Sequence, residues 1–468
     1  MHNREGKLNE ECGVIGVIGT KDATRSVYYG LYALQHRGQE NAGIAANKGG
    51  EIDCVKGTGL VADVFEQKHI ERLEANIAIG HVRYAKAGED KPYNAQPLVA
   101  KFKHGHMALA HNGSLVNGES IREMLEDTGV IFHTTVDTEA ILNLIARNYK
   151  RGLETAIKST MSLIKGAYAL VMTVEDKLIG IRDPHGLRPL CLGKTHDGYV
   201  LASESCAIDT IGGEFIRDID PGEIVIIDKD GVESITSTNW CPKNLCIFEL
   251  VYFARPDSKL DDVGVYKFRK EAGKELARLG KIDADVVIPV PDSGIPSAVG
   301  FSEESGIPYA EGLVKNRYIG RTFIQPTQDM REREVRIKLN VLRENIEGKR
   351  VVIIDDSIVR GTTMTHIVEL IRKVGGKEVH VCIASPPVAN PCYFGIDTPY
   401  RKDLIGANLS NEEICKLIGA DSLRYLPVEG MARATGRTEG FCKACFDGKY
   451  PMEVPMEVPM EAAPNMGN

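Results

Sequence analysis

Apolar residues in the first half of the chain occur in short runs that Gly and Asn interrupt. Runs of this kind are typical of strands joined by tight turns, and they lie at 12–19, 75–85, 107–115, 168–174 and 198–205. Two segments, 24–35 and 138–149, have helical spacing instead. From residue 12 to residue 240 the pattern therefore predicts stacked sheets flanked by helices, an α+β layer arrangement.

The pattern changes near residue 245. From residue 262 onwards, helical segments alternate with strands that are apolar at successive positions, such as 286–290 and 351–354. Strands that are buried on both faces and alternate with helices are typical of a parallel, doubly wound sheet. We therefore predict a second domain of the α/β class over residues 241–430.

The remaining segments follow neither pattern. Residues 1–11 form a polar leader without periodicity, and residues 431–450 form a separate C-terminal segment. Residues 451–468 are a low-complexity Pro-Met-Glu repeat, for which we predict disorder. Within the second domain, the basic stretch 315–340 is long for a plain connection, and such loops are usually functional or mobile.

Composition narrows the possible functions. The 468 residues carry a net charge of -8, which argues against a general nucleic-acid surface. No apolar run is long enough to cross a membrane, and the first residues lack the apolar segment of a signal peptide. We therefore expect a cytoplasmic protein that binds neither nucleic acid nor membrane. Eleven cysteines are many for a reducing compartment, although single buried thiols are common.

Cys12 opens the first apolar run, directly after the polar leader. A buried strand cysteine is the commoner explanation for a single Cys. The alternative is that the leader is removed and Cys12 becomes the N-terminal residue. Its own α-amino group, with an ordinary pKa of about 7.7–8.0, could then serve as the base for its thiol.

In the second domain, an apolar strand ends in two adjacent acids, Asp355 and Asp356, and a turn of small and hydroxyl residues leads into a helical pattern. Backbone N–H groups at such a helix start, together with Thr hydroxyls, can hold a phosphate. The paired acids suit ribose hydroxyls or a hard cation such as Mg²⁺. A strand-to-helix turn with capping acids is the structural alternative. The Gly-x-Gly-x-x-Gly spacing of dinucleotide-binding folds is absent.

The first domain resembles the N-terminal-nucleophile glutamine amidotransferases over residues 12 to 240. The motifs occur in the order of that family, and they are CGVIG at 12–16, LQHRGQE at 34–40, GHVRY at 80–84, HNG at 111–113 and DTE at 137–139. The resemblance implies the layered fold of the N-terminal-nucleophile hydrolases and glutamine as a substrate.

By position, the resemblance gives roles to particular residues. Cys12 would attack the glutamine side-chain amide and form a thioester. Asn112 and the Gly113 amide would form the oxyanion hole. Arg83 would hold the α-carboxylate of the substrate, and Asp137 would pair with its α-amino group.

Each of these assignments has a plainer alternative. Arg83 could be a solvated charge at a strand end, Asn112 and Gly113 could form a hairpin turn, and Asp137 could be a helix N-cap. Lys86 stands where the family has a small hydroxyl residue, which leaves local details of the glutamine pocket open but not the reaction.

The segment 351–363 resembles the signature of the type I phosphoribosyltransferases. The resemblance implies that this turn binds phosphoribosyl pyrophosphate, through Asp355, Asp356, Ser357, Arg360, Gly361, Thr362 and Thr363. It also implies that Ser293, Asp355 and Asp356 hold Mg²⁺ with the donor, because 290–294 resembles the pyrophosphate-binding loop. The stretch 315–340 resembles the flexible loop that closes over the donor and excludes water.

Joined in this order, the two domains resemble the amidophosphoribosyltransferases over nearly the whole chain. That resemblance implies the first committed step of purine synthesis, in which glutamine, phosphoribosyl pyrophosphate and water give phosphoribosylamine, glutamate and pyrophosphate. It also implies internal transfer of ammonia between the two sites, a homotetramer, and inhibition by purine nucleotides.

Four of the cysteines depart from the pattern of scattered thiols. Cys442 and Cys445 form a C-x-x-C pair, which alone is ambiguous between zinc, a redox pair and an iron–sulfur cluster. A zinc ribbon would need a second close pair, and the sequence has none. Cys246 and Cys392 stand where the iron–sulfur branch of the amidophosphoribosyltransferases has cysteines. The resemblance therefore implies a structural [4Fe–4S] cluster on these four thiolates, with 431–450 as the cluster-binding segment.

Two other functions remain open. The glutaminase domain could serve another acceptor, as in sugar-phosphate amination or asparagine synthesis, although the Asp355-Asp356 turn argues against this. The chain could instead be a non-catalytic sensor of phosphoribosyl pyrophosphate, although Cys12 and the Asn112-Gly113 pair argue against that.

Overall fold

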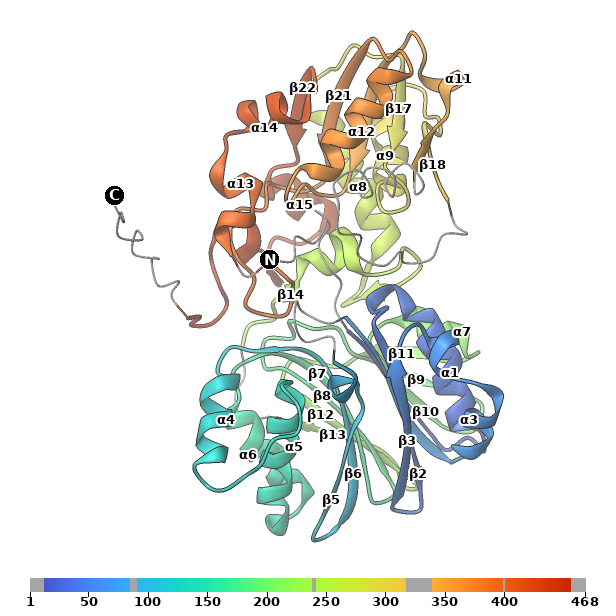
Figure 1. Ribbon diagram of the computed structural model, residues 1–468, viewed down its shortest axis with the longest axis vertical. Coiled ribbons are helices and arrows are strands. Elements are labelled where there is room, and N and C mark those ends of the chain that lie inside the picture. Colours follow the sequence, from blue (N-terminus) through green and yellow to red (C-terminus); the bar gives the residue numbers. More distant parts are fainter. Residues whose placement is uncertain (1–11, 85–90, 238–240, 317–338, 399, 456–468) are drawn as a thin grey trace, which may run out of the picture.

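The computed structural model describes residues 12–84, 91–237, 241–316, 339–398 and 400–455. In its first half two antiparallel sheets face each other, and helices cover the outer side of each sheet (Figure 1). The second half is built around a parallel sheet. This architecture confirms the predicted α+β layers followed by an α/β domain.

Each sheet of the first half has its own set of helices. The strands of the first sheet are, in spatial order, β11 (Glu214–Asp218), β9 (Cys191–Lys194), β10 (Tyr199–Ala202), β1 (Gly13–Ile18), β4 (Ile77–Arg83), β2 (Asn41–Lys48) and β3 (Glu51–Thr58). Those of the second sheet are β13 (Gly231–Thr236), β12 (Glu223–Asp228), β8 (Lys177–Arg182), β7 (Gly166–Val174), β6 (Gly105–Leu115) and β5 (Leu98–Phe102). The helices of the first layer are α1 (Ala23–Ala33), α2 (Val61–Val64), α3 (Gln67–Arg72) and α7 (Ser205–Thr210), and those of the second are α4 (Gly118–Glu126), α5 (Asp137–Asn148) and α6 (Leu153–Leu163). Three short 3-10 turns are η1 (Gln35–Arg37), η2 (Pro92–Asn94) and η3 (Tyr149–Arg151).

Strand β1 shows why the apolar runs produce these layers. All six of its residues are buried. Val14 packs in the core between the two sheets, whereas Ile15 packs in the core between the first sheet and its helices. Gly16 lets the sheets approach, because a Cβ there would lie 2.6 Å from Leu178 and Val171 of the opposite sheet. A strand with two buried faces requires an uninterrupted apolar run.

The parallel sheet of the second half is also buried on both faces. Val352 and Ile354 pack on one face with helices α8 and α9, and Val351 and Ile353 pack on the other with α12 and α14. The strands, in spatial and chain order, are β17 (Val286–Pro289), β20 (Arg350–Asp355), β21 (Glu378–Ile383) and β22 (Ser422–Tyr425). The helices are α8 (Val265–Arg278), α9 (Ile295–Ser305), α12 (Thr362–Lys373) and α14 (Asn411–Ile418). Because the strands are parallel, their carboxyl ends share one edge of the sheet.

Shorter elements surround this sheet and connect it to the first half. The paired strands are β14 (Leu245–Cys246) with β23 (Phe441–Cys442), β15 (Lys259–Leu260) with β16 (Val263–Gly264), and β18 (Leu313–Lys315) with β19 (Leu339–Val341). The helical elements are the π-helical turn η4 (Glu249–Phe253), the 3-10 turn η5 (Arg401–Asp403), and helices α11 (Arg343–Ile346), α13 (Ile405–Asn408), α15 (Val428–Thr435) and α16 (Ala444–Asp447).

The two predicted helices are present, with slightly shifted ends, as α1 and α5. Helices α4 and α6 have no counterpart among the sequence predictions, because Ser, Thr and Glu intersperse their apolar positions. No helix within the described residues combines the length and apolar character needed to cross a bilayer.

The C-terminal tail corrects one prediction. Met452 and Val454 pack against a buried apolar cluster, and the Tyr450 hydroxyl donates a hydrogen bond to the Pro391 carbonyl at 2.7 Å. Predicted disorder from residue 451 is therefore wrong for 451–455, because alternate apolar residues of the repeat find a hydrophobic surface. The other predictions made for 1–11, Lys86, 317–338 and 456–468 concern positions outside the described residues.

Candidate active site

Several elements of the first half meet around a cavity of about 430 Å³. All the residues predicted for glutamine hydrolysis contribute to its wall, and they are Cys12, Arg83, Asn112, Gly113 and Asp137. These residues are far apart in the sequence, so the layered fold is what brings them together. Gly395, from the second half of the chain, completes the wall.

Cys12 lies half-buried, immediately before β1. Strand β1 is held in the first sheet by antiparallel pairing with β4 and β10. The Cys12 thiol lies 4.0 Å from the Tyr84 carbonyl oxygen, and the Arg37 Nε donates a hydrogen bond to the Cys12 carbonyl at 3.1 Å. The main chain of Cys12 is therefore fixed, while its side chain reaches the cavity.

Asn112 and Gly113 lie within β6 and pair with Ala169 and Tyr168 of β7, so the hairpin-turn alternative is wrong. The side-chain amide nitrogen and oxygen of Asn112 are buried and have no hydrogen-bond partner among the residues that the structure describes. Buried polar atoms of this kind are rare and call for an explanation. Gly113 has φ +136, and a Cβ there would lie 2.0 Å from the Ala167 carbonyl oxygen, so no other residue fits. The strand thus brings an unpartnered amide to the cavity.

Arg83 and Asp137 lie on other parts of the wall. Arg83 ends β4 and is 3% exposed, which excludes a solvated strand-end charge. Asp137 is the first residue of α5, and Val136 is the N-cap, so the N-cap alternative for Asp137 is wrong. One Asp137 oxygen accepts a hydrogen bond from the Leu115 amide at 2.9 Å. The positive end of the α5 dipole favours a negative charge at this position.

A buried histidine lies behind the cavity wall. His81 on β4 has its Nε2 3.0 Å from the carbonyl oxygen of His111, a residue that lines the cavity. Burial lowers the pKa of His81 from 6.5 to about 3. His81 is therefore neutral at physiological pH and donates this hydrogen bond from Nε2.

The predicted donor turn has the expected strand–turn–helix form. Strand β20 ends in Asp355, and both Asp355 and Asp356 are buried. The Asp356 carboxylate accepts hydrogen bonds from the Ser293 hydroxyl and, at 2.6 Å, from the Ser357 hydroxyl. Gly361, with φ +82, is the N-cap of α12. All the residues predicted to bind the donor lie at the end of β20, in the turn, or at the start of α12, and they are Asp355, Asp356, Ser357, Arg360, Gly361, Thr362 and Thr363.

Ser293 approaches the acids because its loop packs on the end of β20. The Val290 amide donates a hydrogen bond to the Ile354 carbonyl at 2.8 Å, and a Cβ on Gly294 would lie 2.5 Å from the same oxygen. Within the described part of the chain, no three acidic, His or Cys side chains are grouped as ligands of one metal ion. Two carboxylates and a hydroxyl nevertheless suit Mg²⁺, which usually takes only one or two protein carboxylates beside water and substrate phosphates.

The four cysteines predicted for the cluster lie near one another at the junction of the two halves. Strands β14 and β23 pair in parallel with Cys246 opposite Cys442, and the Cys445 carbonyl accepts hydrogen bonds from the amides of Ala389 and Asn390, just before Cys392. Burial, with a smaller contribution from the neighbouring Cys392, raises the pKa of Cys246 and Cys442 to about 12. The absence of a single-ion site in the described residues does not decide against a cluster, because a [4Fe–4S] cluster takes one thiolate per iron.

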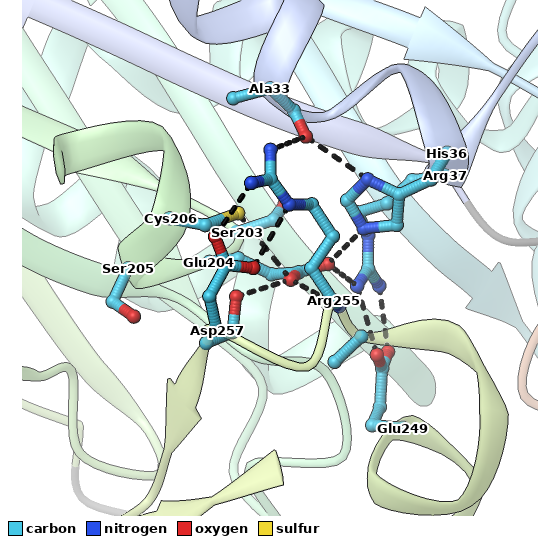
Figure 2. A network of polar contacts seen from close by, with 12 residues as sticks. Ala33, His36, Arg37, Ser203, Glu204, Ser205, Cys206, Glu249, Arg255 and Asp257 are labelled. Atoms are coloured by element: carbon cyan, nitrogen blue, oxygen red, sulfur yellow. Dashed lines mark hydrogen bonds and ion pairs between the residues drawn. The ribbon is translucent and has the colours of Figure 1, made fainter. Parts of the chain in front are cut away.

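A buried ionic network joins the halves behind Cys12 (Figure 2). Besides holding the Cys12 carbonyl, Arg37 makes ion pairs with Glu204 at 2.6 Å and with Glu249 at 2.7 Å. His36 also contacts Glu204, at 2.7 Å. Although burial opposes it, the charges of His36 and Arg37 lower the pKa of Glu204 well below its ordinary range. Glu204 is therefore charged, and both carboxylates are paired with Arg37.

Comparison with known proteins agrees with this geometry. Family models match a "Glutamine amidotransferase domain" over residues 81–210 and a "Phosphoribosyl transferase domain" over residues 269–392. The chain is 48% identical over 453 residues to the amidophosphoribosyltransferase of Bacillus subtilis, and the match covers 96% of this chain and 95% of the relative. It is 49% identical over 450 residues to the amidophosphoribosyltransferase of Archaeoglobus fulgidus, with 95% and 98% covered.

The chain belongs to the amidophosphoribosyltransferase family.

Solved structures support the same assignment. One, described as the allosteric regulatory enzyme of purine biosynthesis, has a TM-score of 0.91 and 48% identity, covering 95% of this chain and 97% of that one. Another is the B. subtilis glutamine phosphoribosylpyrophosphate amidotransferase complexed with ADP and GMP, with a TM-score of 0.90, 47% identity, and 95% and 98% covered. The order of the two domains and their fold are therefore those of the family.

Some residues of the cavity and its surroundings have no role in the sequence analysis. Gly395 gave no signal, because a single glycine in an irregular segment says nothing about what it touches. Arg37 lies in the LQHRGQE motif, but the motif does not show that its side chain turns towards the Cys12 carbonyl. Glu249 lies beyond the first domain, so only the folded chain reveals its contact with Arg37.

Proposed function

We propose that the chain makes phosphoribosylamine from phosphoribosyl pyrophosphate, with ammonia released from glutamine at Cys12, as the first committed step of purine synthesis. The observation that carries the proposal is the cavity on which Cys12, Arg83, Asn112 and Asp137 meet. In the other half of the same chain, the parallel strand β20 leads into two adjacent acids, and helix α12 follows them. Neither a glutaminase alone nor a donor-binding sensor would need both.

In the first half, Arg83 and Asp137 would hold the α-carboxylate and α-amino group of glutamine and leave its side chain facing Cys12. The thiolate attacks the amide carbon, and the oxygen that becomes negative is held by the Asn112 amide and the Gly113 N–H. The leaving nitrogen takes a proton and departs as ammonia. Water then cleaves the thioester and releases glutamate, which restores the thiol.

Proton transfer in this step needs a base next to the thiol. We propose that the leader 1–11 is removed, so that the α-amino group of Cys12 takes the thiol proton and passes it to the leaving nitrogen. The support is the position of Cys12 at the anchored start of β1. Mass spectrometry of the active protein should find Cys12 at the N-terminus, and full activity with residues 1–11 attached would contradict this.

In the second half, Asp355 and Asp356 would bind the ribose hydroxyls of the donor. The residues from Ser357 to Thr363 would bind its 5′-phosphate at the start of α12. Mg²⁺, held by Ser293 and the two acids with the donor, would neutralise the departing pyrophosphate. Ammonia then forms the new bond to the anomeric carbon as the bond to pyrophosphate breaks. We propose that the stretch 315–340 closes over the donor and that ammonia passes internally between the two sites.

We further propose a structural [4Fe–4S] cluster on Cys246, Cys392, Cys442 and Cys445. The nearness of the four thiols supports it, and Cys246 and Cys442 are buried, where an apolar environment otherwise disfavours thiolates. Iron and sulfide should each approach four per chain after anaerobic purification, and stoichiometric zinc without iron would contradict the proposal. Cys442→Ser should yield insoluble or unstable protein, whereas Cys54→Ser, a single thiol on β3, should have little effect.

A solved relative suggests how the protein is regulated. The B. subtilis relative was solved with ADP and GMP, and we propose that purine nucleotides inhibit this chain and that it works as a homotetramer in the cytoplasm. Inhibition assays with AMP, ADP and GMP and a mass measurement in solution test these two points.

One assay tests the main proposal against its alternatives. Glutamine hydrolysis is measured with and without phosphoribosyl pyrophosphate and Mg²⁺, and phosphoribosylamine is trapped as it forms. We expect the donor to stimulate hydrolysis and one amine product per glutamate. Glutamate release without an amine product would indicate another acceptor, and donor binding without glutamate release would indicate a sensor.

A further inference from the structure

Arg37 uses its whole guanidinium group at the junction of the two halves (Figure 2). Its Nε donates to the Cys12 carbonyl, and its Nη1 and Nη2 donate to the two Glu249 oxygens at 2.9 and 2.7 Å. Such a two-point contact fixes orientation as well as distance. The same Nη1 also donates to Glu204 of the first half at 2.6 Å, so the side chain that orients the main chain of Cys12 is itself oriented by one carboxylate from each half.

Glu249 is the first residue of the π-helical turn η4, and short π-helical segments are frequent at functional sites. The turn is held at several carbonyls by Arg269 of α8. Arg269 Nε donates to Leu250 O at 2.9 Å, and its Nη2 donates to Tyr252 O at 2.9 Å and to Ala254 O at 2.8 Å. Glu249 therefore sits on a turn whose backbone is fixed to the core of the second half.

Arg269 is costly where it lies. It is 3% exposed, it makes no ion pair with any described residue, and burial lowers its pKa to about 10. A buried guanidinium whose partners are only carbonyl oxygens adds little to the free energy of unfolding, because these contacts do not fully replace its lost hydration. Its position instead keeps the backbone of η4 in a fixed place relative to α8.

Helix α8 is in turn fixed to the loop 290–294 that carries Ser293, which we call the donor loop. The Ser297 hydroxyl of α9 donates to the Arg269 carbonyl at 2.9 Å. A Cβ on Gly273 would lie 1.9 Å from Ser297 O, and one on Gly300 would lie 1.9 Å from Lys270 O, so the two helix backbones are in direct contact. Helix α9 begins two residues after Ser293, whose hydroxyl contacts Asp356. The donor loop, α9, α8 and η4 are therefore successive parts of one packed unit.

We infer that Glu249 is a positioning residue for glutamine hydrolysis, through which the phosphoribosyltransferase half holds Arg37 and hence Cys12, and that Arg269 connects it to the donor loop. The inference rests on the proposed function, because it explains how donor at Ser293 and Asp356 would alter hydrolysis at Cys12. It assigns no contact between Glu249 and either substrate.

The test uses the full-length, cluster-loaded protein with Glu249→Gln, which keeps shape but removes the charge. With phosphoribosyl pyrophosphate present, we expect kcat for glutamine to fall between about tenfold and a hundredfold, since small misplacements of reacting groups cost this much. KM for glutamine and synthesis from free ammonia should stay within about twofold. The donor should also no longer change the rate at which iodoacetamide alkylates Cys12.

The chain offers a matched control. Asp261 pairs with Arg182 across the same two halves, with both side chains 1% exposed and both contacts at 2.9 Å, but it does not touch Cys12 or Arg37. Asp261→Asn should lower stability and leave kcat for glutamine unchanged. Equal loss of kcat in Asp261→Asn and Glu249→Gln would overturn the inference, because any broken pair at the junction would then have the same effect.

A second variant decides the matter if Glu249→Gln fails to fold, as loss of its ammonia-dependent synthesis would indicate. Arg269→Lys keeps the charge but replaces the rigid guanidinium fork, whose Nε and Nη2 reach three carbonyls of the turn, with one compact ammonium that does not reproduce that geometry. We expect glutamine hydrolysis without donor to be unchanged and its stimulation by donor to be lost. Normal stimulation in Arg269→Lys would overturn the inference. If the unmodified protein makes no amine from glutamine, the proposed function fails instead, and the two failures are thereby distinguished.

Discussion

The glutamine cavity and the donor turn are built in opposite ways. The cavity takes Cys12, Arg83, Asn112 and Asp137 from separate elements and a wall residue, Gly395, from the other half. The donor turn takes nearly all its predicted ligands from one run, 355–363, between β20 and α12. Tertiary packing therefore fixes the first site, whereas one local connection provides the second.

The two sites also differ in whether their polar groups already have hydrogen-bond partners. The buried amide atoms of Asn112 have no partner in the described part of the chain, as expected of a group that binds charge developing only during reaction. The Asp356 carboxylate already accepts from Ser293 and Ser357. Under the proposed function, the cavity would serve a transition state and the turn would hold a charged substrate.

The largest effect should come from Cys12→Ala. It removes the nucleophile, so glutamine-dependent synthesis should fall by about 10⁶-fold, the scale seen when a catalytic nucleophile is deleted. Synthesis from free ammonia should remain, because the donor turn is untouched. The two rates are compared at saturating donor, with Cys54→Ala as the control. A Cys12→Ala protein that cannot use ammonia either would show that the sites are not separable.

The reverse separation should follow from Asp355→Asn combined with Asp356→Asn. The double change keeps shape but removes both charges, and we expect synthesis from glutamine or ammonia to fall on the order of 10⁴-fold. Basal glutamine hydrolysis should survive but no longer respond to the donor. Asp285→Asn is a matched control, because Asp285 binds Arg350 at the opposite end of β20. Normal synthesis by the double variant would contradict the role of the turn.

Asn112→Ala tests the claim that the cavity is prepared for the transition state. Loss of one oxyanion donor should lower kcat for glutamine by about 10²- to 10³-fold and leave KM nearly unchanged. Asn47→Ala serves as the control, because Asn47 is equally buried in the same layers but is hydrogen-bonded to Thr173 and Glu175. Asn47→Ala should destabilise the protein without changing kcat. A rise in KM alone for Asn112→Ala would make Asn112 a substrate-binding residue.

Gly395→Ala tests the part of the cavity that the second half supplies. Gly395 has φ +123, and a Cβ there would lie 2.8 Å from the Arg188 guanidinium. The displaced wall should lower kcat/KM for glutamine about tenfold and leave ammonia-dependent synthesis intact. Gly306→Ala is the control, because Gly306 also has positive φ but its Cβ would meet nothing within 4 Å. Equal effects of both changes on glutamine use would mean that only backbone strain matters.

The contrast between the sites also explains what the sequence could predict. The donor turn was readable from the residues themselves, because strand, acids and helix start are adjacent and each has a local physical meaning. The layered and α/β folds followed from the burial of apolar runs on both faces. Asn112 and Gly113, by contrast, resemble a hairpin turn until β6 is seen to pair with β7 through both, and only family resemblance gave them a role.

Contacts across the junction could not be predicted at all. The ion pair of Arg37 with Glu249 and the place of Gly395 in the cavity wall depend on how the two halves of the chain pack against each other. No periodicity or motif encodes that docking. The packing of Met452 and Val454 was missed for the same reason, because a low-complexity repeat shows its composition but not the surface it meets.

The smallest predicted effect is a pH dependence of the free energy of unfolding, which arises from a histidine in the first half. His81 lies behind the cavity, and its pKa falls from 6.5 to about 3 on burial. The unfolded chain binds a proton at this residue below pH 6.5, but the folded protein does not until about pH 3. The contribution of His81 to stability is therefore fully present above pH 6.5 and is lost as the pH falls towards 3. Between about pH 7.5 and 5.5 the free energy of unfolding should drop by about 1.4 kcal/mol from this residue.

The urea midpoint should fall less over this range in His81→Gln, which binds no proton. His196→Gln is the control, because the His196 side chain is 97% exposed. The same pH dependence in wild type and His81→Gln would show that acid acts elsewhere, and the cavity would then be no more sensitive to pH than the donor turn.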